Sequence, residues 1–348
     1  MPALLDRFHV LGRSGLRVSP LSLGTMTFGT EWGWGTPKDE CRRILDAYVE
    51  AGGNFVDTAN FYTGGTSETF LGEFLAGRRD EIVLATKYAL AMRPGDANSG
   101  GSHRKNLMQS LDASLARLKT SYIDLYWVHA WDFTVPIDEV VRALDDAVRA
   151  GKVLHAGVSN APAWVVARAN TMAELRGWTA FCATQVQYSL AERAIEREIV
   201  PMCSDTGVGV VAWSPLAGGV LSGKYARADS GSKAPLDESL RKESNQKRAN
   251  ERNLAIIAVA EAVAAEIGRS AAQVAVRWVM QRPGVGSVII GARTLAQLND
   301  NLQAAAFELS AEQMQRLDAA SRIEAGYPHD YLRSSTVTRF LYGGARIE

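Results

Sequence analysis

The chain is 348 residues long, 47% of them are hydrophobic, and its 38 Lys and Arg residues balance its 38 Asp and Glu residues. This balance excludes a strong electrostatic field for nucleic acid or an anionic membrane, and no apolar run approaches the roughly 20 residues of a membrane helix. The three cysteines are too few and too widely spaced for a disulfide framework or a Cys-x-x-Cys metal site.

The start of the chain shows no export signal. Residues 1–10 include Asp6, Arg7 and His9 and lack the apolar core of a signal peptide. We therefore expect a cytoplasmic protein with reduced thiols, no nucleic-acid partner, no membrane insertion and a small-molecule substrate. The composition leaves the oligomeric state open, and a homo-oligomer is compatible with it.

The expected elements follow one another in a regular order. Residues 8–18, with a turn from Gly12 to Gly15, predict a β-hairpin. Short apolar runs then predict strands near 21–24, 54–57, 82–86, 123–128, 153–158, 182–187, 208–213 and 287–290. Amphipathic patterns predict helices near 38–50, 67–76, 103–117, 138–149, 162–175, 192–205, 254–267 and 294–305.

This alternation predicts a (β/α)8 TIM barrel with an N-terminal β-hairpin, a C-terminal extra helix and a tail. Three segments do not belong to the minimal barrel. Residues 89–102 include Pro94, Asn98 and three Gly residues, residues 221–253 are highly charged, and residues 325–348 form an aromatic-rich tail. Long loops in compact domains are usually functional lids or mobile segments. The sequence does not fix the course of these three.

Polar side chains follow the predicted strands directly. Asp57, Lys87 and His129 stand where three successive strands end, and Tyr62 follows Asp57 by five residues. The exits of parallel barrel strands converge on one rim, so an acid, an amine, an imidazole and a phenol would share one site there. Such a set can move a proton next to a carbonyl group.

Several motifs in this order resemble those of the aldo-keto reductases over nearly the whole chain. They are Gly12-Arg13-Ser14-Gly15, Leu23-Gly24-Thr25-Met26, the segment 57–62, Gly151-Lys152-Val153, Gly157-Val158-Ser159-Asn160 and Trp213-Ser214-Pro215-Leu216. The resemblance implies that residues 1–348 form a single aldo-keto-reductase-like barrel domain with nicotinamide-dependent carbonyl reductase activity. The segment 218–225 favours the branch that includes bacterial aldehyde reductases and potassium-channel β-subunits.

Carbonyl reduction needs a proton donor at the oxygen, and Tyr62 is the candidate because a phenol with a reference pKa of about 10 holds its proton at neutral pH. Lys87 as an ammonium would stabilise the developing phenolate, and Asp57 would keep Lys87 charged. His129 would hydrogen-bond and orient the carbonyl oxygen. These four residues match the family's catalytic tetrad.

Each of the four residues also has an ordinary structural interpretation. Alone, an Asp or a Lys at a strand end is more often part of an ion pair, and a lone His is usually a half-buried structural residue. Catalysis is favoured because all four residues stand together, in matching positions at or just after the ends of successive strands. Tyr126 and Tyr188 are rival phenols, but Tyr126 falls within a strand and Tyr188 is more typical of a pocket wall.

A nicotinamide cofactor would have to bind without the usual glycine fingerprint, because no strand is followed by G-x-G-x-x-G. The resemblance implies that Ser159, Asn160 and Gln185 hydrogen-bond the carboxamide and that Trp213 stacks on the ring. The structural alternatives are that Trp213 fills the core and that Asn160 caps the next helix.

The segment from Gly218 to Lys224 nearly matches a phosphate-binding P-loop. The match fails at Tyr225, where a P-loop needs the hydroxyl of Ser or Thr for magnesium. A loop that closes over the pyrophosphate is the better interpretation, with donors from Ser214, Leu216 and Gly218 and a charge from Lys224.

The segment after the last strand suggests NADPH (NADP+) rather than NADH. Gly291 and Arg293 precede a helix, and helix N-termini attract anions that an Arg can grip through two donors. Arg293 would bind the 2′-phosphate, while Gln297 and Asn301 would face the adenine. The family often has Ser or Lys where Arg293 stands, Pro at position 290 and Glu at position 300, so NADH is less favoured without being excluded.

The substrate would be an aldehyde or a ketone, held by an aromatic wall. Trp32, Trp34, Phe61, Tyr88 and Trp131 lie near the predicted rim. Thr63, where the family often has Gly, would narrow or polarise the entrance. One alternative is an NADPH-binding regulatory subunit with little catalytic role. Another is a metal-dependent hydrolase, which needs clustered His, Asp or Glu ligands at strand ends. The chain has five His residues, of which only His129 and His155 lie near predicted strands, and this disfavours the hydrolase.

Overall fold

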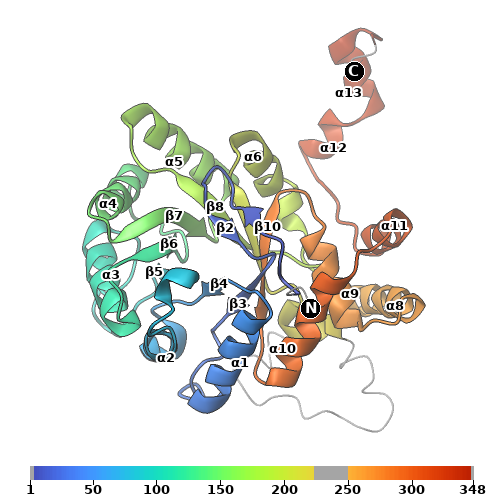
Figure 1. Cartoon of the computed structure of the whole chain (residues 1–348). Coiled ribbons are helices and arrows are strands. Elements are labelled where there is room, and N and C mark those ends of the chain that lie inside the picture. The colour runs from blue at the N-terminus through green and yellow to red at the C-terminus, as the bar shows by residue number, and fades with distance from the viewer. Residues whose placement is uncertain (1–3, 223–249, 346–348) are drawn as a thin grey trace.

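The protein is described by a computed structural model that covers residues 4–222 and 250–345. Within these residues, eight parallel strands close into a barrel in which β10 pairs with both β3 and β9 (Figure 1). The strands are β3 (Leu21–Gly24), β4 (Phe55–Asp57), β5 (Val83–Tyr88), β6 (Ile123–Val128), β7 (Val153–Ser159), β8 (Phe181–Gln187), β9 (Gly209–Trp213) and β10 (Val285–Gly291). The predicted TIM barrel is confirmed.

Helices surround the barrel, as the sequence pattern predicts (Figure 1). They are α1 (Lys38–Glu50), α2 (Thr66–Phe74), α3 (Arg104–Leu118), α4 (Ile137–Arg149), α5 (Ala163–Arg176), α6 (Ile199–Thr206), α8 (Glu251–Glu266), α9 (Ala271–Met280) and α10 (Leu295–Leu302). None of the helices in the described ranges is both long and apolar enough to cross a membrane.

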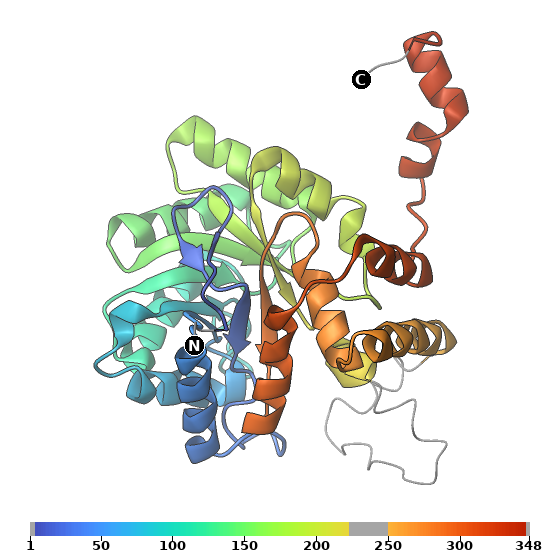
Figure 2. The ribbon, with the colours of Figure 1, turned by 45° about the vertical axis from the view of Figure 1, so that its right-hand side comes forward.

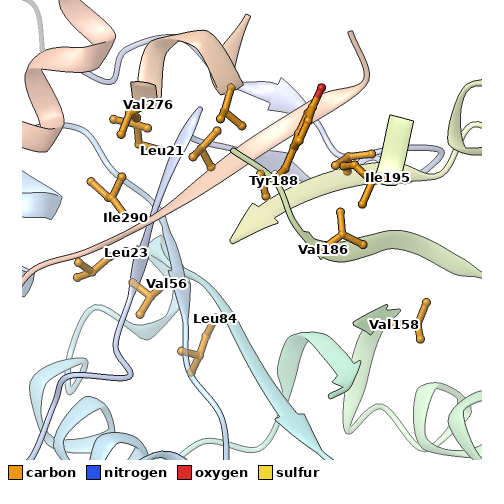
Figure 3. Close-up of a cluster of buried hydrophobic side chains, with 14 of the residues drawn as sticks. Leu21, Leu23, Val56, Leu84, Val158, Val186, Tyr188, Ile195, Val276 and Ile290 are labelled. Carbon is orange, nitrogen blue, oxygen red and sulfur yellow. The ribbon is translucent and has the colours of Figure 1, made fainter. Parts of the chain in front are cut away.

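The strands separate two hydrophobic layers, because alternate side chains of a strand point to opposite faces. Leu84, Val158 and Ile290 belong to the outer layer, between the barrel and the helices (Figure 3). The inner layer is smaller and has Phe55 and Trp127 among its members. The side chains of this inner layer fill the barrel interior, so the polar residues at the strand ends lie above a packed core.

The N-terminal hairpin closes the amino-terminal end of the barrel. Strands β1 (His9–Val10) and β2 (Arg17–Val18) pair antiparallel, which confirms the predicted hairpin. Leu11 and Val18 pack into the inner layer, and the His9 ring lies 2.9 Å from the Gly286 carbonyl oxygen. The hairpin therefore lies at the end of the barrel opposite the rim where the strands exit.

Helix α9 was not predicted from the sequence. Eight of its ten residues are buried, and its polar face consists of Gln273 and Arg277 alone, too narrow to reveal an amphipathic helix. Its signal was the capping box of Ser270 and Gln273. The prediction of one helix over 192–205 was also wrong, because a 3-10 turn, η3 (Ala194–Glu196), precedes α6, whose first turn accommodates Pro201.

The end of the chain leaves the barrel. The extra helix α11 (Ala311–Ala320) is followed by α12 (His329–Leu332) and α13 (Ser335–Tyr342), which project away from the barrel (Figure 2). A cavity of about 420 Å³ between α6 and this tail is lined by His329 and Arg333, together with Val210 and Gly284 at the amino-terminal ends of β9 and β10. The tail thus lies toward the end of the barrel opposite the rim.

Candidate active site

Polar residues occupy inward-facing positions at the carboxyl ends of three successive strands. Asp57 follows the inward Phe55 by two residues, Lys87 follows Ala85, and His129 follows Trp127. The parallel register sets Asp57 against Ala85 and Lys87 against Trp127. A period of two therefore turns each of these polar side chains toward the barrel axis.

Lys87 is the centre of this group. Its side chain is fully buried, and its ammonium donates hydrogen bonds to the Asp57 carboxylate and, at 2.7 Å, to the Thr58 carbonyl oxygen. The Tyr62 hydroxyl lies 3.3 Å from the same nitrogen. The structure thus joins Asp57, Lys87 and Tyr62 in one hydrogen-bonded chain.

Charge pairing keeps the Lys87 side chain protonated. Burial lowers the pKa of Lys87, but the charge of Asp57 and the interactions with Tyr62 outweigh this effect and raise it above its ordinary value. Asp57 accepts a second bond of 2.8 Å from the Gln185 amide. A buried ammonium held in this way is a fixed positive charge beside a phenol.

Tyr62 reaches the group from a tight turn after β4. The 3-10 turn η1 (Tyr62–Gly65) contains left-handed backbone at Thr63 and Gly64, which turns the chain back toward α2. The Tyr62 and His129 rings pack edge to face, with their centroids 5.9 Å apart, and the Lys87 nitrogen lies 4.9 Å from the Tyr62 ring centroid. All four residues of the predicted tetrad therefore lie together.

His129 is neutral at physiological pH. Burial, and to a lesser degree the charge of Lys87, lowers the pKa of His129 from 6.5 to about 3. Its Nδ1 atom is buried and has no hydrogen-bond partner in the part of the chain that the structure describes. A neutral imidazole can donate one hydrogen bond to a carbonyl oxygen without competing for its proton.

This lowered pKa predicts a pH dependence of stability. As pH falls below 6.5 the unfolded chain protonates His129 while the folded chain does not, so the free energy of unfolding decreases. Between pH 7 and pH 5 we expect the wild type to lose about 2 kcal/mol more than His129→Gln. Urea unfolding at both pH values measures this difference, and parallel losses in the two proteins would contradict the buried neutral state.

The rival phenols are used elsewhere. Tyr126 stacks on Tyr88 at 5.2 Å in the outer layer, and burial raises its pKa well above the ordinary value. The Tyr188 hydroxyl donates to Glu196 at 2.6 Å, its ring packs beside Trp278, and Tyr188 lines the cavity between α6 and the tail. Neither phenol contacts Lys87.

The residues expected at the carboxamide lie beside the tetrad and bind one another. Ser159 donates to the Gln185 carbonyl oxygen at 2.9 Å, and the Asn160 amide donates to the His129 carbonyl oxygen at 2.9 Å. Asn160 has left-handed backbone with φ 52°, as residues at functional turns often do. The contact of Gln185 with Asp57 was not anticipated, although both stand at inward positions of their strands.

The loop after β9 carries the residues expected at the pyrophosphate. Trp213 ends the strand half-buried, and Ser214 follows with left-handed backbone at φ 57°. The Ser214 hydroxyl accepts the Gly218 N–H at 3.2 Å, and Leu216 lies between them, half-buried. The predicted contribution of Lys224 lies outside the described residues.

The residues expected at the adenosine end surround the start of α10. Gly291 ends β10, and the Arg293 N–H donates to the exposed Gln297 side chain at 2.8 Å. Asn301 is buried, and its amide donates to the Gly291 carbonyl oxygen at 3.2 Å. Arg293 and Gln297 are thus accessible to a ligand, whereas Asn301 braces the strand end.

The rim has hydrogen-bonding capacity that suits a nicotinamide cofactor. Asn60, His129 and Trp213 carry buried polar atoms without a hydrogen-bond partner among the described residues. Such atoms in native proteins are usually hydrogen-bonded to water or a ligand. Asn160 and Gln185 each use their amide N–H groups and retain an oxygen that accepts hydrogen bonds. The donor and acceptor set therefore fits a carboxamide.

Aromatic residues stand beside the phenol, with one exception. The Trp32 ring centroid lies 5.5 Å from that of Trp34 and 5.8 Å from that of Phe61, which directly precedes Tyr62 in the chain. Trp131 is nearly buried after His129. Tyr88 does not belong to this wall, because it follows the inward Lys87 by one residue and therefore points outward, where its hydroxyl donates to Ser102.

No group of three or more His, Cys, Asp and Glu side chains within 4–222 and 250–345 could hold a metal ion.

Comparison with known proteins identifies relatives of the whole barrel. The family model described as the aldo/keto reductase family matches residues 20–322. A norsolorinic acid reductase of Emericella nidulans is 39% identical over 369 aligned residues, which cover 100% of this chain and 92% of the relative.

Two further relatives carry names of the same general kind. An aryl-alcohol dehydrogenase (NADP+) of Phanerodontia chrysosporium is 38% identical, over 94% of this chain and 89% of its own length. A protein of Emericella nidulans named aldo-keto reductase is 34% identical, over 94% of this chain and 85% of its own length. Each of the three matches covers at least 94% of this chain.

Proposed function

The chain belongs to the aldo/keto reductase family and is a nicotinamide-dependent oxidoreductase of small carbonyl compounds, and from this premise we propose a specific reaction. The protein reduces an aldehyde or a ketone to the alcohol with NADPH, and Tyr62 gives the proton. The observation that carries the proposal is the buried Lys87 ammonium between the Asp57 carboxylate and the Tyr62 hydroxyl.

Tyr62 is the proton donor in this proposal. When bound, the nicotinamide supplies a hydride to the carbonyl carbon, and the oxygen then needs a proton. A phenol alone is a weak acid, but an ammonium 3.3 Å from its oxygen stabilises the phenolate that remains after proton transfer. Asp57 and the Thr58 carbonyl oxygen hold the ammonium in place, so its position costs little reorganisation during the reaction.

His129 orients the substrate in this proposal. Its imidazole is neutral because burial and Lys87 lower its pKa to about 3. A neutral ring cannot replace Tyr62 as the acid near pH 7, but its N–H can donate to the carbonyl oxygen. Tyr62 and His129, whose rings meet edge-on, would together hold the oxygen from two sides.

NADPH is the proposed cofactor because of the start of α10. Arg293 directly precedes Thr294, the N-cap of α10, and a guanidinium can bind a phosphate through two donors. A relative at 38% identity is named for NADP+. Ser159, Asn160, Gln185 and Trp213 would hold the nicotinamide end, and Ser214, Leu216, Gly218, Lys224, Gly291 and Gln297 the remainder, with Asn301 holding Gly291 in place.

The cofactor preference can be measured directly. We expect NADPH to bind about 10- to 100-fold more tightly than NADH, as charge-assisted hydrogen bonds to one phosphate would give. Quenching of tryptophan fluorescence measures both affinities, and Arg293→Ala should bring them close together. Equal affinities in the wild type, or an unchanged ratio in the variant, would contradict the role of Arg293.

The reaction itself is tested by a screen of purified protein with NADPH against aldehydes, ketones and sugars. We expect NADPH absorbance to fall with at least one carbonyl class. Loss of every such signal in a protein that still binds NADPH would contradict the proposed reduction.

A further inference from the structure

Thr63, the residue after Tyr62, has an unusual conformation. It is nearly fully buried, and its φ of 48° and ψ of 39° lie in the left-handed region. A β-branched residue seldom adopts this region, because its side chain collides with its own backbone. Such strain persists only where the surroundings fix it, and it concentrates at functional sites. Something must therefore hold Thr63 in place.

The loop after β3 holds it. The Thr63 hydroxyl donates to the Phe28 carbonyl oxygen at 2.7 Å, across 35 residues of sequence. A methyl group added to Gly29 would lie 2.9 Å from the Thr63 hydroxyl oxygen, so the loop backbone packs directly on this side chain. A second bond of 2.5 Å joins the Thr66 hydroxyl to the Glu31 carboxylate. Thr63 and Thr66 thus clasp the loop to the turn of Tyr62.

The clasped loop carries two tryptophans. Backbone hydrogen bonds between Gly29 and Thr36 join its two ends, so residues 29–36 form a closed loop. At its tip Trp32 lies 5.8 Å from the ring of Phe61 and 5.5 Å from Trp34. Trp32 is half-buried and Phe61, the chain neighbour of Tyr62, is 38% exposed, so both rings keep surface for a ligand.

We propose that Thr63 determines substrate specificity, because its clasp holds Trp32 and Phe61 as a rigid aromatic wall that selects flat aromatic aldehydes and ketones. This inference rests on the proposed reductase function. Aromatic rings bind planar groups by offset or edge contacts, and a wall that is ordered in advance loses less conformational freedom when the substrate arrives. An aliphatic carbonyl of equal size offers no flat surface to the wall.

The test compares benzaldehyde with cyclohexanecarbaldehyde, which have the same ring size but differ in planarity. Thr63→Gly removes the hydroxyl and the strain together, so this variant should fold, and Thr63→Ser keeps the hydroxyl. We expect Thr63→Gly to lower the ratio of the two kcat/KM values about tenfold, mainly through KM for benzaldehyde. Thr63→Ser should keep most of the ratio.

Thr69→Ala is the matched control, because the Thr69 hydroxyl donates only to Gly65 within its own helical turn. It should leave the ratio as in the wild type. A second readout is amide hydrogen exchange over 28–36, which should become faster in Thr63→Gly and stay slow in Thr63→Ser.

Three outcomes would overturn the inference. The first is a wild type that reduces cyclohexanecarbaldehyde as readily as benzaldehyde, which leaves the reductase function intact. The second is an equal fall for both substrates in Thr63→Gly, with the ratio unchanged, and the third is unchanged amide exchange in that variant. A wild type that binds NADPH but reduces no carbonyl would instead remove the proposed function, and the inference with it.

Discussion

Tyr62→Phe should lower the rate of NADPH-dependent carbonyl reduction by about 10²- to 10⁴-fold, the usual contribution of a positioned general acid. Only the hydroxyl is lost, so the ring can keep its edge contact with His129 and its place over Lys87. Neither neighbour can replace the acid, because Lys87 is held by Asp57 and His129 is neutral. Single-turnover decay of NADPH absorbance measures the step.

The matched control is Tyr331→Phe, which removes an exposed phenol of the tail. It should react at the wild-type rate. Fluorescence quenching should show that Tyr62→Phe still binds NADPH, which separates chemistry from binding. A Tyr62→Phe protein with the full single-turnover rate would remove this phenol from the mechanism.

Lys87→Met should affect both stability and turnover strongly. Lys87 and Asp57 are both almost completely buried, so removal of the ammonium leaves a carboxylate without its partner in the core. Breaking such a pair typically costs about 3–5 kcal/mol of unfolding free energy. Burial already raises the pKa of Asp57, and uptake of a proton by the carboxyl would recover part of this loss. Urea unfolding at pH 7 measures the result.

The double variant Asp57→Asn/Lys87→Met separates stability from catalysis. Two neutral groups remain, so we expect the double variant to regain stability relative to Lys87→Met. Turnover should stay low in both variants, because the charge beside the Tyr62 oxygen is absent. A double variant with turnover close to the wild type would show that Lys87 serves only the fold, and equal stability of the two variants would argue against a buried ion pair.

The barrel and the meeting of the tetrad follow from local rules that the sequence displays. Apolar runs such as 123–128 alternate with amphipathic helices, and parallel strands of this kind close with their exits on one rim. Asp57, Lys87 and His129 each follow an inward apolar residue by two positions. Sequence spacing and strand polarity were therefore sufficient to predict that these side chains meet.

Other features depend on contacts that spacing does not reveal. Helix α9 is buried on nearly all sides, and only Gln273 and Arg277 among its ten residues are polar. The bond from Gln185 to Asp57 spans 128 residues and depends on how the barrel closes. The Thr63 clasp requires left-handed backbone that a threonine does not suggest. The prediction that Tyr88 belongs to the aromatic wall is wrong, because neighbouring residues of a strand point to opposite faces and Tyr88 follows the inward Lys87.

The account depends most on the claim that the Lys87 ammonium stabilises the Tyr62 phenolate. Ultraviolet difference titration of the wild type against Tyr62→Phe isolates this one phenol. Burial raises the pKa values of Tyr48, Tyr88, Tyr126 and Tyr188, so these phenols ionise later. The charge of Asp57 and the interactions with Tyr62 raise the pKa of Lys87 despite its burial, which keeps the ammonium present during the titration.

We expect the Tyr62 signal at a lower pH than the pH of about 10 at which an ordinary tyrosine ionises, and we expect it to move upward in Lys87→Met. A Tyr62 that ionises at or above the ordinary pH in the wild type, or whose midpoint is unmoved in Lys87→Met, would contradict the central claim.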